Sequence, residues 1–270
     1  MAHAFSSDLK EQDRDSGEQT ASPSARNLQG SGVRALPAWG VTAATIPTIE
    51  ASLEEGLKIL DAHFSRHPYL LGGRPSLADF GFMAPFFAHL SRDPHLSAVM
   101  KAHGPRVYRW TERMNLAGFV DGGFPDVAPE YFPDDQIPDT LVTFLRYLFA
   151  DHGPGMVGLL GSYNAWVDAH PDLPPGTVIE SNPDLASGFM TGGHPAFGRY
   201  EFELRGVRIQ RIEFLDAVYH FQRVLDVIAD LEGDARRRFD ALMEQTGASD
   251  LLGMRPARRL AHEHYRLRLP

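Results

Sequence analysis

The chain has 270 residues, of which 43% are hydrophobic, and a formal net charge of -9 at pH 7. This acidic balance argues against non-specific binding to nucleic acid, because phosphate contacts need clustered Lys and Arg side chains. Cysteine is absent, which excludes disulfides, thiolate nucleophiles and sulfur-ligated zinc. No apolar run has the length of a signal peptide or a membrane span, so we expect a cytoplasmic protein that does not bind membranes.

Residues 1–32 are dominated by Ser, Asp, Glu, Gln, Arg and Gly. A segment with so few apolar residues cannot bury enough surface to offset the entropy lost on ordering. We therefore expect a disordered N-terminal segment.

Residues 33–116 have the pattern of a helical bundle. After a short remnant of helix around Val33 to Trp39, a long amphipathic helix is predicted that ends near His67-Pro68. Two shorter helices are predicted at residues 95–102 and 105–114. The apolar stripe of the long helix recurs at steps of three and four residues and consists of Ile46, Ile49, Leu53, Leu57, Leu60 and Phe64.

Ser76 and Asp79 have the spacing of a capping box. In that motif the Ser side chain accepts from the backbone N–H three residues on, and the acidic side chain reaches back to the N–H of Ser76. The role predicted for both residues is therefore structural. The helix that they begin is apolar on most faces, which is typical of the middle of a bundle; it contains Phe80, Phe82, Met83, Phe86, Phe87 and Leu90.

The ordered set Tyr69-Leu-Leu-Gly, Arg74-Pro-Ser-Leu-Ala-Asp-Phe80 and Pro105-Arg-Val-Tyr-Arg-Trp110 resembles the C-terminal domain of the glutathione transferase family. The resemblance implies an all-helical domain in which the capping box begins the central helix and is a folding determinant. It implies no cofactor, with glutathione as a possible substrate. It also implies an apolar substrate pocket, for which the candidate lining residues are Phe82, Phe86, Tyr108 and Trp110.

The other half of that family is a thioredoxin-like domain that binds glutathione and activates its thiol. The residues before Ile46 are too few for this domain, so we expect that it is missing and assign no catalytic residue. One segment, Val178-Ile-Glu-Ser181, is similar to the pair that holds the γ-glutamyl end of glutathione. Asn182-Pro183 follows at once, however, and favours a loop.

Residues 117–136 are rich in Gly, Pro, Asp and Phe and are predicted to form a connector that wraps the bundle. Residues 137–270 are predicted to form a helical extension with a β-hairpin near 200–213, around Arg205-Gly206, and a basic end that is strand-like or irregular. The chain resembles longer bacterial members of the family in this respect. The predicted fold is mainly α: a glutathione-transferase C-terminal-like bundle with an additional helical region carrying one small hairpin.

Three other patterns are candidates for binding sites. His262-Glu263-His264 lacks a third ligand at a fixed spacing, so no metal site is predicted. His63 and His67 are four residues apart, a spacing compatible with one helix face. Pro68 indicates that His67 lies at a frayed helix end, where an imidazole favours the helix dipole. The run Arg236-Arg237-Arg238 is interpreted as a solvated helix face, with a phosphate site or an acidic partner as the alternative.

Two hypotheses of function follow. In the first, the protein is a non-catalytic or truncated helical module whose exposed apolar surface meets a partner or a second copy of itself. In the alternative, it is a glutathione-dependent transferase whose site is completed by another chain or by the extension. The first hypothesis needs fewer assumptions.

Overall fold

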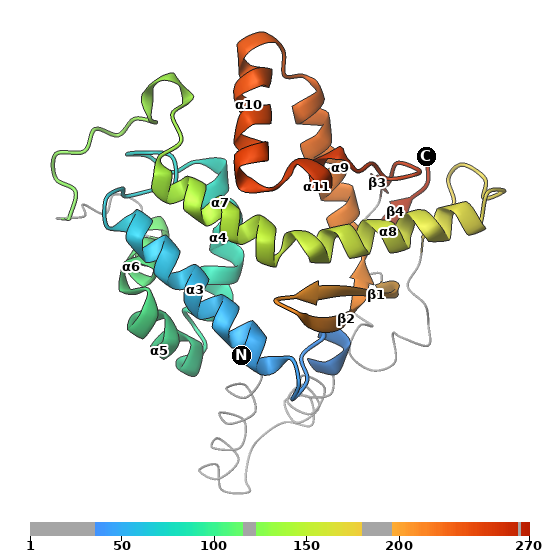
Figure 1. Cartoon of the computed structure of the whole chain (residues 1–270), viewed down its shortest axis with the longest axis horizontal. Helices are drawn as coiled ribbons and strands as arrows, with labels where there is room; N and C mark the ends of the chain where they lie inside the picture. The colour runs from blue at the N-terminus through green and yellow to red at the C-terminus, as the bar shows by residue number, and fades with distance from the viewer. Residues whose placement is uncertain (1–35, 116–122, 180–195, 264–265) are drawn as a thin grey trace, which may run out of the picture. The chain divides into compact units, whose positions relative to one another are not determined.

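The computed structural model describes residues 36–115, 123–179, 196–263 and 266–270 (Figure 1). The segment predicted to be disordered, residues 1–32, lies outside these ranges. The described chain divides into two compact units, one formed by residues 49–148 and the other by residues 36–48 together with 149–270. Among the described helices, none is both long and apolar enough to cross a membrane.

The first unit is a bundle of helices, as predicted. Its core includes the expected stripe of the long helix, of which Leu57, Leu60 and Phe64 are buried against Met100 and Trp110. Helices α5 and α6 lie side by side within it (Figure 1). The elements are α3 (Ile46–Phe64), α4 (Leu77–Met83), η2 (Ala84–Leu90), α5 (Pro94–His103), α6 (Pro105–Asn115), η3 (Pro133–Asp135) and most of α7 (Asp139–Asp151).

The central apolar helix is not a single α-helix. After α4 the chain widens into one stretch of π-helix, η2, in which the N–H of Ser91 donates to the carbonyl of Phe86 at 2.8 Å. Pro85 lies in the first turn of this stretch and has no N–H for the usual helical bond, so the regular ladder is interrupted there. The apolar pattern predicted the helix but not this change of pitch.

The described part of the connector, residues 123–136, lies against the bundle. The N–H of Gly73 donates to the carbonyl of Glu130 at 2.7 Å, and the N–H of Phe132 donates to the carbonyl of Leu71 at 3.0 Å. A Cβ built on Gly73 would lie 1.8 Å from the carbonyl oxygen of Ala128. Glycine is therefore required where the connector passes this loop.

Helix α7 lies at the start of the predicted extension, which was expected to begin at residue 137. Its residues up to Leu148 nevertheless belong to the first unit. Leu141 and Phe144 are buried in the same core as α3, and the ring centroid of Phe144 lies 5.5 Å from that of Phe82. An amphipathic stripe shows which face of a helix is buried but not which core receives it. The division of the chain by packing therefore falls after Leu148 rather than at Ile137.

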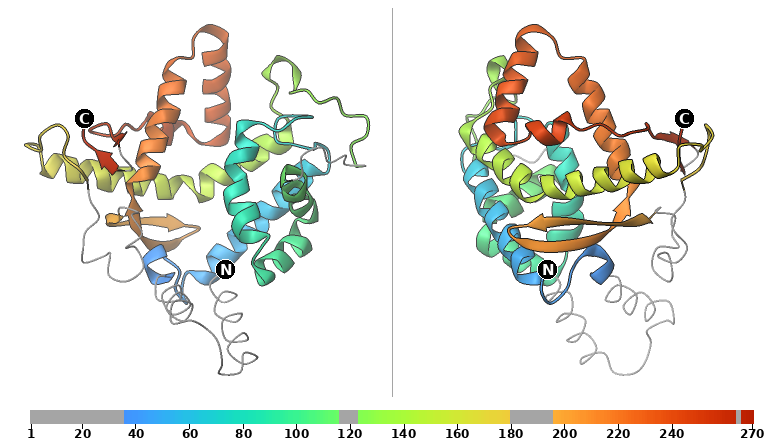
Figure 2. Two further views of the ribbon diagram at one scale, coloured as in Figure 1. Left: turned by 180° about the vertical axis from the view of Figure 1, so that it is seen from behind. Right: turned by 45° about the vertical axis from the view of Figure 1, so that its right-hand side comes forward.

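The second unit combines helices with the predicted hairpin. Strands β1 (Ala196–Leu204) and β2 (Val207–Phe214) are antiparallel, and Leu204 faces Val207 across the turn. Arg205 and Gly206 have φ values of 52 and 78, which suit the two-residue turns that match strand twist. The hairpin lies along α8, and α9 and α10 run out and back as a helical pair (Figure 2). The helical elements are η1 (Leu36–Trp39), α8 (Gly153–Ala169), α9 (Leu215–Ala229), α10 (Gly233–Thr246) and α11 (Ser249–Gly253).

A second strand pair closes this unit, so the prediction of one hairpin was incomplete. Strands β3 (Ala261–Glu263) and β4 (Arg266–Arg268) are antiparallel. The segment Thr177–Ile179 joins β4, since the N–H of Ile179 donates to the carbonyl of Leu267 at 3.0 Å and the N–H of Leu269 donates to that of Thr177 at 2.9 Å. Val178 and Ile179, predicted to lie in a loop, are thus paired, whereas Glu180 and Ser181 lie outside the described residues.

Candidate functional site

The capping residues Ser76 and Asp79 lie at the start of α4, in capping-box geometry. The backbone N–H of Ser76 donates to Oδ2 of Asp79 at 2.8 Å, and the Ser76 hydroxyl donates to the same oxygen at 2.7 Å. The other oxygen, Oδ1, accepts from the N–H of Leu70 at 3.1 Å and from Nε1 of Trp110 at 3.0 Å.

Asp79 is therefore more than a cap. Its carboxylate is fully buried and is bound by donors from three segments of the first unit: the start of α4, the loop at Leu70 and the middle of α6. A buried charge is tolerated where hydrogen bonds satisfy it in this way. The sequence pattern missed the two longer-range partners. The available signal was Trp110, because a buried indole N–H needs an acceptor.

Three of the four aromatic residues proposed as a substrate pocket are packed on one another. The ring centroid of Phe86 lies 5.9 Å from that of Phe82 and 6.0 Å from that of Trp110. Trp110 is also stacked on Phe64, with ring centroids 5.1 Å apart. Trp110 is only 1% exposed. These rings are part of the core of the bundle.

The fourth candidate, Tyr108, is half-buried on α6. The ammonium group of Lys101 lies 4.5 Å from the centroid of its ring, in cation–π geometry. Tyr108 packs against the same hydrophobic core as Phe82, Phe86 and Trp110, but the ring contacts described above for those three residues do not include it. The structure thus packs three candidates ring against ring and leaves Tyr108 half-buried against the same core, beside Lys101.

His63 lies in the last turn of α3 and is fully buried. Its Nε2 lies 3.1 Å from the carbonyl oxygen of Tyr69, and its Nδ1 lies 2.8 Å from the hydroxyl of Thr140. A carbonyl only accepts, so Nε2 carries the proton and Nδ1 accepts from Thr140. Burial lowers the pKa of His63 to about 4, and the ring is therefore a neutral structural residue at pH 7.

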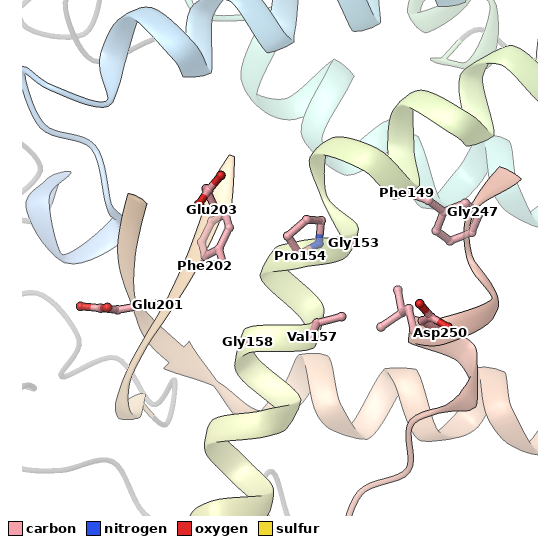
Figure 3. Close-up of a pocket in the computed structure, with 11 residues that line it drawn as sticks. Phe149, Gly153, Pro154, Val157, Gly158, Glu201, Phe202, Glu203, Gly247 and Asp250 are labelled. Carbon is pink, nitrogen blue, oxygen red and sulfur yellow. The ribbon is translucent and has the colours of Figure 1, made fainter. Parts of the chain in front are cut away.

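The second unit contains a cleft of about 430 Å³, which we name the α8 cleft (Figure 3). It lies between the first turns of α8, the end of β1 next to the hairpin turn, and the segment that joins α10 to α11. Its lining residues all belong to the second unit: Phe149, Gly153, Pro154, Val157, Gly158, Glu201, Phe202, Glu203, Gly247, Asp250 and Leu251.

Glycines at the start of α8 make this cleft. A Cβ built on Gly158 would lie 2.6 Å from the carbonyl oxygen of Glu201, so only glycine lets β1 approach the helix so closely. A Cβ on Gly155 would touch the ring of Phe202 at 3.6 Å. None of the motifs described above predicted the cleft. The signal that pointed to it was the spacing of glycines at positions 153, 155 and 158 within an otherwise apolar helix.

A carboxyl group is buried where β2 meets α8. Glu213 is 2% exposed, and the hydroxyl of Ser162 donates a hydrogen bond to its Oε1. Burial raises the pKa of Glu213, and the hydrogen bond from Ser162 acts in the opposite direction. No pattern in the sequence singled out this residue.

Two arginines of the run on α10 form ion pairs with acidic residues of the same helix. Nε of Arg236 lies 2.9 Å from each carboxylate oxygen of Asp240, and Arg237 forms an ion pair with Asp234. A groove of about 830 Å³ passes this surface. Because two of the three guanidinium groups already have acidic partners, the geometry favours the interpretation as a solvated face over a phosphate site.

Comparison with known families adds a relationship for one part of the chain. Residues 43–113 match the family model described as glutathione S-transferase, C-terminal domain. The match spans α3 to α6, including the capping box and the aromatic core, and confirms the resemblance inferred from the motifs between Tyr69 and Trp110. Comparisons with curated proteins and with solved structures found no match. Over residues 43–113 the chain is thus similar to the helical C-terminal domain of glutathione transferases.

Proposed function

We propose that this protein is a non-catalytic helical module of the glutathione-transferase type that works by association, and that it associates with a second copy of itself. The observation that carries the proposal is the outer face of α4 and η2, which we name the α4 face. Between positions 77 and 88 every exposed residue is apolar: Leu77, Ala78, Phe80, Gly81, Ala84, Pro85 and Ala88.

Two large apolar side chains of this face are mostly exposed to solvent. Leu77 is 88% exposed and Phe80 is 59% exposed. Contiguous apolar surface of this kind marks interaction sites, because its burial removes apolar area from water. The capping box favours the same arrangement, since it fixes the helix start and so the direction in which Leu77 and Phe80 point.

The choice of a second copy rests on charge. Two chains that each carry a net charge of -9 repel one another. The exposed residues of the α4 face carry no charge. In a two-fold contact at this face, the apolar surface of one copy therefore packs on that of the other, and no like-charged side chains are brought together.

The non-catalytic part of the proposal is supported by the aromatic core. In the transferase alternative, Phe82, Phe86 and Trp110 line a substrate pocket. Their rings contact one another, and the indole N–H of Trp110 is already bonded to Asp79. A substrate would have to displace these contacts, which contribute to the stability of the fold.

The test of association is sedimentation velocity of the full chain at micromolar concentration. We expect a dimer for the natural sequence and a monomer for the double variant Leu77→Glu and Phe80→Glu. The matched control is Val227→Glu, which also places a charge at an exposed apolar position, 67% exposed on α9, and should remain dimeric. A monomeric natural chain, or a double variant that stays dimeric, would contradict the proposal.

The test of catalysis is glutathione binding by calorimetry, with a conjugation assay on an electrophilic aryl halide in the same sample. We expect neither heat of binding nor turnover. Turnover that Tyr108→Phe or Phe86→Ala reduces would instead support the transferase alternative.

A further inference from the structure

The hairpin of the second unit lies along α8, and its two ends are held by different kinds of contact. At the turn, Nε of Arg205 lies 2.8 Å from Oδ2 of Asp151, so opposite charges meet. At the other end, the hydroxyl of Ser162 in α8 donates a hydrogen bond to Oε1 of Glu213 in β2. An ion pair therefore holds the turn, whereas a hydroxyl and a buried acid hold the far end.

Packing encloses the carboxyl group of Glu213, which is 2% exposed. A Cβ built on Gly198 of β1 would lie 3.3 Å from both carboxylate oxygens, so the missing side chain leaves the space that this group occupies. The second oxygen, Oε2, is buried and has no hydrogen-bond partner among the residues that the structure describes. An ionised carboxylate here loses its hydration without gaining a second donor, whereas the neutral acid has no charge to desolvate.

The ionisable groups on the elements around Glu213 do not compensate its charge. Tyr200 of β1 stays a neutral phenol, because burial raises its pKa and the charge of Glu213 adds to this shift. Arg211 of β2 already forms a hydrogen bond with Tyr200. Asp216, in the first turn of α9, is itself acidic. From α8 the contact is the hydroxyl of Ser162.

We propose that Glu213 is a pH-dependent switch that controls how firmly the hairpin is held on α8: protonation of its carboxyl group keeps this end of the hairpin against the helix, and ionisation releases it. Because β1 also forms one wall of the α8 cleft, release of the hairpin widens that cleft. The inference goes beyond the proposed association and does not depend on it, since it uses residues of the second unit alone.

The sign of the pH dependence follows from burial. Burial raises the pKa of Glu213 above its ordinary value of 4.5, and the hydrogen bond from Ser162 opposes this shift without reversing it. The folded chain therefore binds this proton more tightly than a chain in which water surrounds the carboxyl group. The stabilisation by the proton is complete below pH 4.5 and is lost as the pH rises through the raised pKa.

The experiment is hydrogen exchange of the full chain, followed by mass spectrometry between pH 5 and pH 8, with rates corrected for the chemical exchange of free peptides. We expect the corrected exchange of β1, β2 and the part of α8 around Ser162 to be about threefold or more faster at pH 8 than at pH 5. Peptides of α3 are the internal control. The buried His63 there makes the first unit less stable, not more, as the pH falls.

Three variants assign the effect to this carboxyl group. Glu213→Gln keeps the shape without the charge, so the corrected exchange of the hairpin should no longer depend on pH. Ser162→Ala removes a donor that favours the ionised form, and should enlarge the difference between pH 5 and pH 8. The matched control is Glu203→Gln, the same change at an exposed position of β1, which should keep the pH dependence of the natural chain.

The proposal is overturned if the corrected exchange of the natural hairpin is the same across this pH range, or if Glu213→Gln retains the natural pH dependence. Should Glu213→Gln fail to fold, Ser162→Ala decides, since an unchanged pH dependence in that variant would also overturn the proposal. A monomeric chain in sedimentation would remove the proposed dimer and leave these outcomes unchanged, so the two proposals fail separately.

Discussion

A single buried carboxylate connects the parts of the first unit. Asp79 accepts hydrogen bonds from Ser76, Leu70 and Trp110, so it joins a helix start, a loop and a second helix. The local half of this arrangement was predictable, because a capping box is a pattern of four residues. The other half was not, because it depends on which indole the bundle brings to the carboxylate.

The two members of the capping box should therefore differ in importance. Ser76→Ala removes one capping side chain and should lower the free energy of unfolding by about 1 kcal/mol. Asp79→Ala also leaves the N–H of Leu70 and the indole N–H of Trp110 without their buried acceptor, and should cost about 3 kcal/mol. Urea unfolding followed by Trp fluorescence measures both values. Equal losses for the two variants would show that the longer-range bonds of Asp79 contribute nothing.

His63 should make the first unit sensitive to acid. Its pKa is about 4 in the folded chain, against 6.5 for an ordinary histidine, because burial disfavours the charged ring. As the pH falls through 6.5 the unfolded chain takes up this proton while the folded chain does not. The contribution of His63 is therefore complete above pH 6.5 and is lost by about pH 4, to an extent on the order of 3 kcal/mol.

The measurement is the free energy of unfolding in urea between pH 7.5 and pH 4 for the natural chain and for His63→Gln. The natural chain should lose more stability over this interval than the variant. His95→Gln is a suitable control, because His95 is exposed and its replacement should preserve the natural pH dependence. If the free energy of unfolding depended on pH in the same way in all three proteins, His63 would not be the source of the acid sensitivity.

At the scale of elements, periodic patterns and turns were predictable. The stripe from Ile46 to Phe64 gave a helix with the expected buried face, and Arg205-Gly206 gave the two-residue turn of the hairpin. Two features escaped prediction for different reasons. The π-helical pitch of η2 follows from Pro85, a local residue whose effect the apolar pattern does not show, whereas the hydrogen bond that His63 makes in the core depends on Thr140, which is distant in sequence and belongs to α7.

The contact of α8 with β1 provides a matched pair of glycine substitutions. Gly158→Ala should lower the thermal unfolding temperature, because its Cβ would lie 2.6 Å from a backbone oxygen that cannot move without shifting the strand; we expect a cost of about 1–3 kcal/mol. Gly161 lies on the same helix, and a Cβ there meets nothing within 4 Å.

Gly161→Ala should therefore stabilise the chain by about 0.5–1 kcal/mol, because alanine favours the helix. Thermal unfolding followed by circular dichroism compares the two variants directly. If Gly158→Ala were also stabilising, β1 could not lie against α8 as closely as in this structure, and the account of how glycines make the α8 cleft would be wrong.

At the scale of the whole molecule, the residues that the structure describes form two hydrophobic cores rather than one. The first includes Leu57 and Trp110, and the second includes Tyr163 and Leu267. Composition and length alone could not decide between one core and two, because both arrangements bury similar amounts of apolar surface. The family relationship was readable from motifs in the first unit, whereas the second unit carried no comparable motif.

Two cores predict two unfolding transitions in scanning calorimetry. Leu269→Ala opens a cavity at a fully buried position of the second unit and should cost about 2–5 kcal/mol there. Only one transition should move to lower temperature. Leu60→Ala in α3 should move the other. A single transition that both variants shift equally would show that the units unfold together.

The strand pairing that closes the second unit also has a kinetic consequence. The guanidinium of Arg268 donates to the carbonyl of Gly176, which is 92 positions earlier in the chain. Leu267 and Leu269 become buried only after these two segments have paired. Closing so long a loop loses chain entropy before any contact is gained, and such pairings form slowly. During refolding, Ile179 and these two leucines therefore stay exposed to water longer than locally paired residues. Self-association of incompletely folded chains should begin at this segment.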